Sequence, residues 1–444
     1  MKASCRCELI SFTLEAETEI LLVLEPLYLI MNNTSTIQHG WVSTPDERGT
    51  LDIIWSCVAT LYLCLYTMLH LNIPAPGERV GAHVRRKIRW TLLGLLAPEI
   101  PMLFACGQWA SAKRSVETMH ALGYTCWTVE HAFYADMGGF VLHPADHEPF
   151  PLSAKLVEYL VRHGFICEPS SAITREEIRD KSKADGITRL VTCLQAGSLL
   201  LQVIGRGVEG LPITPLALST LCVAGCSFTT LWFWRNKPLD VMTPTVIMTC
   251  RGVAEILEKG GAAAASARLV IDTPLDFVEP EAYMSRKWSR HVLRWIQAAG
   301  LQSTPMRRVP NDRDPRVPNL VTHLCLGAAT AVFASVHFEA WNATFPTGVE
   351  RSLWCASCVI ICILLGVYGS VEVFICWKEG CRNLGLDTLG GYKRRFPACL
   401  WFFVPSSLYL VARIFILFES VWCMRSMPAS VFVTVPWSEY IPHI

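Results

Sequence analysis

The strongest constraint on this chain is the run from Leu51 to Leu71, LDIIWSCVATLYLCLYTMLHL, which is nearly free of charged residues. A helix needs about 20 mostly apolar residues to cross a bilayer, because lipid offers no hydrogen-bond partners to peptide groups. Composition agrees, since 52% of the residues are hydrophobic and 17% are charged, against about 25% charged residues in a typical soluble domain. The sequence therefore predicts an integral membrane protein.

Seven apolar stretches are candidates for membrane spans. They are residues 51–71, 90–110, 186–206, 211–234, 318–341, 352–377 and 397–422. The second stretch differs from the others because Glu99 lies between Pro98 and Pro101, and proline interrupts the hydrogen-bond ladder of a helix. It is expected to be either a re-entrant or interfacial segment or a complete seventh span.

Basic residues and glycosylation sequons distinguish these alternatives. Short cytoplasmic loops collect Lys and Arg, which places the loop after the first stretch in the cytoplasm. Its basic residues are Arg79, Arg85, Arg86, Lys87 and Arg89. The sequons at Asn32 and Asn33 then lie in the lumen. If residues 90–110 cross the bilayer completely, the sequon at Asn342 falls in the cytoplasm; if they re-enter, it falls in the lumen. Six spans plus a re-entrant segment are therefore favoured over seven spans.

The predicted fold class is all-α, a polytopic transmembrane helical bundle of six to seven spans with a helical cytoplasmic cap. In the cap, Thr174 stands three residues before Glu177, which predicts a capped helix. The predicted segments are an N-terminal lumenal segment 1–50, a first span plus re-entrant or second span 51–110, a cytoplasmic region 111–185, a transmembrane hairpin 186–234, a cytoplasmic region 235–317, three C-terminal spans 318–422 and a tail 423–444.

Five strings occur in an order and spacing that are specific to one family. They are GWVSTPDERGTLDIIWSCVATLYLCLYTMLHLNIP at 40–74, FYADMGGFVL at 133–142, EEIRDKSKADGITRL at 176–190, RNKPLDV at 235–241 and VPWSEYIPHI at 435–444. Through them the chain resembles a large, mostly uncharacterised fungal family of multi-pass membrane proteins. The family carries a WWNKP motif, from which Phe233-Trp234-Arg235 departs. The resemblance implies a multi-pass architecture and a fungal origin, and it supplies no catalytic residues.

Ionisable residues at bilayer depth are functional candidates, because each costs on the order of 2.5 to 3.5 kcal/mol unless it is paired or hydrated. They are Asp52, His70, Glu99, His323, His337, Glu339, Glu372, Arg413 and Glu419. Arg413 lies deep enough to pair with Glu372 or Glu419. Glu99 is the strongest catalytic candidate, since a carboxyl in a dry pocket can hold a proton at neutral pH and act as a general acid. Alternatively, the flanking prolines kink the segment so that Glu99 reaches water.

A second cluster lies in the string VEHAFYADMGGFVLHPADHE. Glu130 and Tyr134 are four residues apart on one helical face, His131 is adjacent to Glu130, and Asp136 follows. Such a set is typical of acid–base chemistry beside a membrane. The catalytic candidates are therefore Glu99, Glu130, His131 and Asp136.

The sequence predicts no metal and no cofactor. His143 and His147 have the spacing of a helical metal pair, but Pro144 follows His143 and the HEXXH order is absent. The sequence also lacks a nucleophile elbow, a dinucleotide-binding glycine fingerprint and a P-loop lysine. A formal net charge of +1 gives no indication of nucleic-acid binding.

Three functions remain open. The first is a cofactor-independent acid–base enzyme, such as a cyclase, isomerase or hydrolase, that acts on a lipophilic metabolite in fungal specialised metabolism. The second is a non-catalytic membrane scaffold or sensor that binds partners through its cytoplasmic regions, and the third is a channel or carrier. The expected partners are the lipid bilayer and a lipophilic small molecule, and the expected location is the endoplasmic reticulum or another endomembrane.

Overall fold

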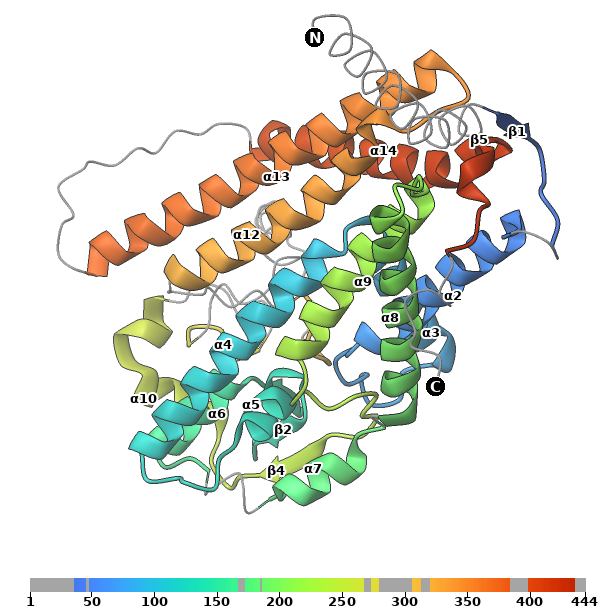
Figure 1. The fold of residues 1–444 in the computed structure, drawn as a ribbon. Coiled ribbons are helices and arrows are strands. Elements are labelled where there is room, and N and C mark those ends of the chain that lie inside the picture. The colour runs from blue at the N-terminus through green and yellow to red at the C-terminus, as the bar shows by residue number, and fades with distance from the viewer. Residues whose placement is uncertain are drawn as a thin grey trace, which may run out of the picture.

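The computed structural model describes residues 36–44, 48–166, 172–183, 186–266, 273–278, 306–312, 320–383 and 398–435. The predicted glycosylation residues Asn32 and Asn33 lie outside these ranges. The described residues form a bundle of long helices with a smaller cap at one end (Figure 1). Helix α4, Glu99–Ala121, starts within the bundle and ends in the cap, so it connects the two parts.

Among the residues that the structure describes, five helices are long and apolar enough to cross a membrane. Three of them qualify over their whole length, namely α2 (Thr50–Met68), α8 (Gly186–Val208) and α9 (Pro215–Phe233). In α13 (Gly348–Asn383) the qualifying stretch is Gly348–Val371. The last stretch, Val404–Arg425, covers most of α14 (Ala398–Trp422) and the 3-10 helix η3 (Cys423–Arg425). A shorter apolar helix, α12 (Leu320–Val336), continues into the 3-10 helix η2 (His337–Asn342). These elements coincide with six of the seven stretches expected from the sequence.

Helix α9 lies inside the bundle, in contact with α2, α4, α8, α12 and α14. Its start is well defined, because Thr214 Oγ1 accepts a hydrogen bond from the Ala217 amide at 3.2 Å and Pro215 occupies the first turn. In α9, 61% of the apolar stretch is buried, compared with 17% in α8. Polar groups on or beside α9 must therefore find their partners within the protein.

The outward faces of the bundle are apolar. On α2 the exposed residues recur at helical spacing and are Leu51, Trp55, Val58, Tyr62 and Tyr66. Helices α8, α13 and α14 also expose Leu, Ile, Val or Phe side chains. Apolar surface of this extent is rare on soluble monomers and marks a surface that contacts lipid or another protein.

Helices α3 (Val80–Leu96) and α4 form a bent pair, with an angle of 108° at the break. Pro98 occupies the break and Pro101 lies in the first turn of α4, where proline is tolerated because it removes no helical hydrogen bond. Near the break α3 packs closely on α2, since a Cβ at Gly94 would lie 2.1 Å from Met68 Cε. The prolines therefore cause a sharp change of direction inside the bundle.

Both arms of this bent pair are joined to the cap side of the molecule. On α3, Lys87 forms an ion pair of 2.6 Å with Asp240, which follows α9. On α4, the Ser115 hydroxyl accepts a hydrogen bond of 3.1 Å from the Trp127 indole in the cap. Both arms of the bent pair therefore have contacts on the cap side, and the bend fits either a broken span or a re-entrant loop.

The described residues are mostly helical, in agreement with the expected all-α class, but the cap also contains a short three-stranded sheet. The elements of the cap are α5 (Val129–Asp136), β2 (Phe140–His143), β3 (Phe150–Leu152), α6 (Ala154–Arg162), α7 (Arg175–Lys181), β4 (Thr245–Met248) and α10 (Val253–Ser266). Strand β2 pairs antiparallel with β3 and parallel with β4. Because β4 comes from the second predicted cytoplasmic region and β2 from the first, the two regions form one cap.

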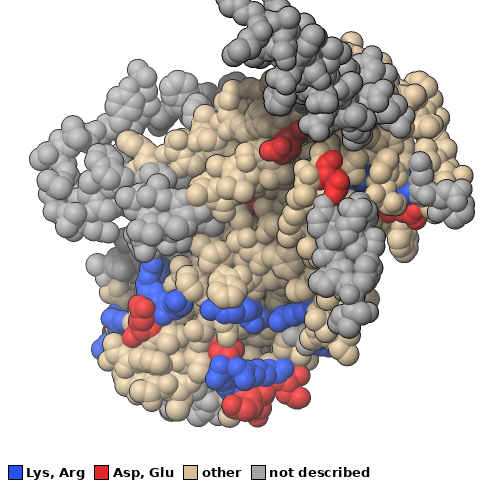
Figure 2. All heavy atoms as spheres, viewed as in Figure 1, with Lys and Arg blue, Asp and Glu red and all other residues tan. Residues whose placement is uncertain are grey.

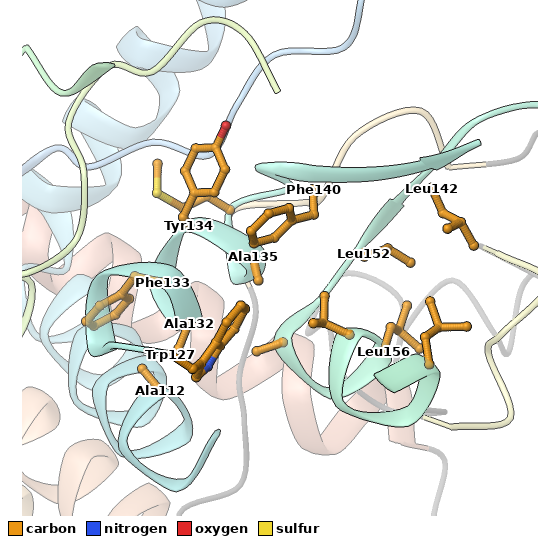
Figure 3. Packing of buried hydrophobic residues seen from close by; sticks show 14 of the residues in the cluster. Ala112, Trp127, Ala132, Phe133, Tyr134, Ala135, Phe140, Leu142, Leu152 and Leu156 are labelled. Atoms are coloured by element: carbon orange, nitrogen blue, oxygen red, sulfur yellow. The ribbon is translucent and has the colours of Figure 1, made fainter. Parts of the chain in front are cut away.

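Aromatic side chains form the core of the cap, around Trp127, Phe133, Tyr134 and Phe140 (Figure 3). A tight turn connects α5 directly to β2, and Gly138 adopts a positive φ of 82° in it. The next residue is also constrained, because a Cβ at Gly139 would lie 2.4 Å from Tyr134 Cδ1. The Gly-Gly pair thus brings β2 back over the aromatic residues of α5.

Helix α7 begins with the capping box that the sequence predicts. The Thr174 hydroxyl accepts a hydrogen bond from the Glu177 amide at 3.2 Å, and the Glu177 carboxylate accepts one from the Thr174 amide at 2.6 Å. The prediction of a capped helix at this position is confirmed.

The two ends of the described chain meet at the end of the bundle away from the cap. Strand β1 (Ile37–His39) pairs antiparallel with β5 (Ser426–Pro428), which is followed by the 3-10 helix η4 (Ala429–Val431). Nearby, Arg206 at the end of α8 is 3% exposed and donates to three carbonyls, those of Pro212 at 3.0 Å, Val433 at 2.8 Å and Ser430 at 2.8 Å. Arg206 therefore fixes the C-terminal segment to the α8–α9 connection.

Candidate functional site

Glu130 lies on α5 and connects three segments of the cap. Its Oε1 accepts hydrogen bonds from Arg175 Nη2 at 2.7 Å, Arg179 Nη2 at 3.0 Å and Asn236 Nδ2 at 3.2 Å. Burial acts to raise the pKa of this carboxyl, but the hydrogen bonds from Arg175 and Arg179 outweigh burial and lower the pKa to about 2. Glu130 is therefore ionised at neutral pH and anchors α7 and the segment after α9 to α5.

Replacing Glu130 by glutamine is expected to destabilise the protein at pH 7 by about 2 kcal/mol, because a neutral amide replaces the charged acceptor of both arginines. The folded-state pKa is depressed from 4.5 to about 2, so the carboxylate stabilises the fold fully above pH 4.5 and this contribution disappears as the pH falls toward 2. Thermal unfolding of the wild type and E130Q should therefore differ at pH 7 and converge at pH 2.

Glu158→Gln provides the matched control for this measurement. Glu158 pairs with Arg162 at 2.8 Å across one helical turn, and the arginine is 51% exposed, so this pair contributes little. Equal destabilisation by E130Q and E158Q, or a difference between wild type and E130Q that does not change with pH, would contradict the anchoring role of Glu130.

His131 and Asp136 also have partners within the cap. His131 Nδ1 accepts a hydrogen bond from the Thr128 amide at 3.2 Å, and Nε2 donates to the Ile173 carbonyl at 3.1 Å. Burial lowers the pKa of His131, in agreement with a neutral ring that accepts at one nitrogen and donates at the other. Asp136 Oδ1 accepts from the Ala154 amide at 2.8 Å, at the first residue of α6. In the structure, Glu130, His131 and Asp136 each connect α5 to a neighbouring segment.

The other polar residues of this region are placed on the sheet side of the cap. The Tyr134 hydroxyl lies 3.0 Å from Thr245 Oγ1 and accepts a hydrogen bond from Lys181 Nζ at 3.4 Å. His143 ends β2, and His147 lies in the connection to β3 with Nδ1 2.8 Å from the Glu148 carbonyl. His143 and His147 lie in a β-hairpin and not on a helix, so their spacing of four residues does not place them on one helical face.

Glu99 is the first residue of α4 and is 2% exposed. At this position the free backbone amides and the positive end of the helix dipole stabilise a negative charge. Its Oε1 accepts a hydrogen bond from the Tyr409 hydroxyl of α14. The break that Pro98 introduces thus places the Glu99 carboxyl at a buried position inside the bundle.

Arg413 lies one helical turn after Tyr409 on the same face of α14 and is fully buried. Its Nε donates to the Leu96 carbonyl at 2.9 Å, and its Nη1 contacts His337 Nε2 at 3.0 Å. A guanidinium only donates, so His337 Nε2 accepts and a neutral ring carries its proton on Nδ1, which is 3.7 Å from Cys222 Sγ. A polar chain therefore runs from α14 through η2 to α9.

Two atoms of this cluster are buried without a hydrogen-bond partner among the described residues. They are Glu99 Oε2 and Arg413 Nη2. A buried polar atom without a partner costs about 1–3 kcal/mol, and such atoms call for a functional explanation. A hydroxyl or carbonyl of a bound molecule would satisfy the guanidinium, and a hydroxyl would also donate to the carboxylate.

We define the Glu99 cluster as Glu99, Tyr409, Arg413, His337 and Cys222. The carboxyl can act as a general acid or base with the Tyr409 phenol as a second proton donor. Arg413 is a fixed positive charge in a water-poor setting, where it stabilises negative charge on a reacting oxygen. The arrangement is therefore suited to proton transfer at an oxygen-bearing carbon centre.

The structure brings together three ionisable residues that the sequence analysis treated separately, namely Glu99, His337 and Arg413. Arg413 does not pair with Glu419, because six residues separate them on α14 and place them on different faces. Sequence reasoning missed Tyr409, and the available signal was its position one turn before a buried arginine. The side chains of His323, Asn342 and Glu372 lie outside the described part of the structure.

The fold and the site define a class of protein: a bundle of apolar helices with a mixed α/β cap and a carboxyl–phenol–guanidinium cluster buried inside, in which five of the described helices are long and apolar enough to cross a membrane. The chain belongs to a family of unknown function, DUF8562, whose pattern matches residues 21–258 and 317–444. No curated protein and no solved structure matches the chain.

Proposed function

We propose that this chain is an integral membrane protein with six spans, one re-entrant segment and a cytoplasmic cap. The six spans are α2, α8, α9, α12 together with η2, α13 and α14. The exposed apolar faces of these helices support contact with lipid. The bent pair α3–α4, both arms of which are joined to the cap side, supports re-entry at Glu99.

The pairing of β1 with β5 supports an even number of spans. Strand β1 precedes α2, and β5 follows α14, so every span lies between the two strands in the sequence. Two segments on opposite sides of a bilayer cannot form one sheet. Their antiparallel pairing therefore favours six spans over seven.

Charge distribution supports a cytoplasmic cap. Lys and Arg gather in a band where the apolar bundle meets the cap (Figure 2). Arg85 and Arg89 are exposed on α3 beside a stripe of exposed apolar residues, as in helices that lie at a membrane surface. By the positive-inside rule this side is cytoplasmic, which leaves Asn342 on the lumenal side of an endomembrane such as the endoplasmic reticulum.

Cysteine labelling of sealed microsomes with a large, impermeant maleimide tests this orientation. The exposed cap cysteines Cys126 and Cys250 are expected to react from the cytoplasmic side, and the reaction should decrease in C126S/C250S. A cysteine introduced by Thr347→Cys, at an exposed position before α13, should react only after detergent opens the vesicles. Labelling of Thr347→Cys in intact vesicles would contradict the proposed topology.

We further propose that the protein is an acid–base enzyme that acts on a lipophilic molecule bearing an oxygen function. The observation that carries this proposal is the pair of buried, unpartnered atoms Glu99 Oε2 and Arg413 Nη2 beside the Tyr409 phenol. The proposal places the chemistry at Glu99 and not at Glu130, because the Glu130 carboxylate already accepts hydrogen bonds from two arginines. Deletion of the gene is expected to cause accumulation of one lipophilic precursor; an unchanged metabolite profile would favour the scaffold.

A further inference from the structure

Lys237, four residues after α9, is buried without a carboxylate partner among the residues that the structure describes. It is 4% exposed. Its Nζ donates to Gln108 Oε1 at 3.0 Å and lies 4.3 Å from the centroid of the Trp234 ring. The same Gln108 oxygen accepts from the Trp234 indole at 3.1 Å. Buried lysines are rare unless paired, so this ammonium needs an explanation.

A second cation lies next to the same tryptophan through His70. The centroids of the His70 and Trp234 rings are 5.7 Å apart, and His70 Nε2 accepts a hydrogen bond from Arg189 Nη2 at 3.4 Å. His70 Nδ1 lies 3.3 Å from the Met68 carbonyl, so the ring is a neutral donor and acceptor. In the described part of the chain, Arg189 likewise has no carboxylate partner.

These two cations retain unused donors. An ammonium has three N–H donors and a guanidinium has five. In the structure, Lys237 donates one side-chain hydrogen bond, to Gln108, and Arg189 donates one, to His70. Burial lowers the pKa of Lys237 to about 7, which shows how unfavourable the isolated charge is. An anion with several acceptor oxygens would satisfy the donors and compensate both charges.

The position of the cations indicates which anion. Lys237 and Arg189 lie where α9 ends and α8 begins, at the junction of the apolar bundle with the cap. This is the level of the basic band in Figure 2, where the phosphates of lipid head groups lie if the bundle spans a bilayer. A carboxylate has two acceptor oxygens, whereas free phosphate or a phosphate monoester, such as the head group of phosphatidic acid, has at least three that can reach separate donors.

We propose that Lys237 and Arg189, with Trp234 and Gln108 as positioning residues, form a binding site for a phosphate group. The phosphate belongs either to a lipid head group or to a free phosphate-bearing molecule. This site is independent of the chemistry at Glu99, because Lys237 and Arg189 share no contact with that cluster.

The test uses the purified full-length protein and measures the thermal unfolding temperature. One arm titrates inorganic phosphate in detergent, and the other compares nanodiscs of phosphatidylcholine with and without phosphatidic acid. The variants are Lys237→Met and Arg189→Gln, with Arg235→Gln as the control, since Arg235 is exposed and lies two residues from Lys237. In phosphate-free detergent K237M should unfold at the same or a higher temperature than the wild type, because it removes a buried charge.

Phosphate is expected to raise the unfolding temperature of the wild type. The apparent affinity for phosphate should be at least about tenfold weaker in K237M and in R189Q, and it should be unchanged in R235Q. A response to both probes supports a site open to free phosphate. A response to phosphatidic acid alone, again weaker in K237M and R189Q than in the wild type and R235Q, supports a lipid head group. Equal responses in the wild type and K237M, or no response to either probe, would overturn the proposal.

Discussion

Replacing Glu99 by glutamine is expected to block the proposed acid–base reaction on a lipophilic molecule while the protein remains folded. Glutamine keeps the size of the side chain and can still accept the Tyr409 hydrogen bond, but it cannot exchange a proton. Loss of a general acid or base reduces a rate by about 10²–10⁴-fold. A strain that carries E99Q should therefore accumulate the same precursor as the deletion strain.

Two further variants separate catalysis from structure. Tyr409→Phe removes only the phenolic oxygen and should also reduce conversion, by less than E99Q. Glu339→Gln is the control, because Glu339 is exposed on η2 and lies outside the Glu99 cluster. Accumulation in E339Q equal to that in E99Q, or a normal profile in E99Q with the deletion strain still affected, would refute catalysis by Glu99. Protein abundance in the membrane fraction must be equal in all strains.

Replacing Arg206 by methionine is expected to have the largest effect on stability. The substitution removes three charge-assisted hydrogen bonds and leaves the carbonyls of Pro212, Ser430 and Val433 without their donor. Removing one partner of a buried charged network costs about 3–5 kcal/mol, which is a large part of the 5–15 kcal/mol that stabilises a typical protein. R206M should therefore unfold at a clearly lower temperature and be less abundant in cells.

Arg235→Met is the control for this effect. Arg235 is exposed and donates to one carbonyl, that of Trp232 at 2.8 Å, so its replacement should change the free energy of unfolding by no more than about 0.5 kcal/mol. Fluorescence-detected size exclusion after heating compares both variants in crude detergent extracts. A heat resistance of R206M equal to that of R235M would show that the C-terminal segment does not depend on Arg206.

The positions of the long helices could be predicted closely from the sequence. The stretches 51–71 and 211–234 correspond to α2 and α9 within a few residues, because a long uncharged run leaves a chain few alternatives. The break at Glu99 was also predictable, since two prolines flank it. These features depend on residues that are neighbours in the sequence.

The sheet of the cap could not be predicted in the same way. Strand β2 has four residues, and its parallel partner β4 begins about a hundred residues later in the chain. So short a strand gives no clear alternation of apolar and polar residues, and its pairing depends on tertiary contacts. The Glu99 cluster could not be predicted for the same reason, because its residues come from four elements that are distant in the sequence. These elements are α4, α9, η2 and α14, and each contributes one or two residues.

The pairing of β1 with β5 has a consequence for biosynthesis. A ribosome synthesises the chain from its N-terminus, so β1 and Arg206 are made long before the residues that they contact, 426–433. Until then, one strand edge is exposed and Arg206 lacks two of its three carbonyl acceptors. This end of the bundle can therefore close only after residues 426–433 have been synthesised, and a chain that terminates before them would leave both the strand edge and the arginine exposed to cellular quality control.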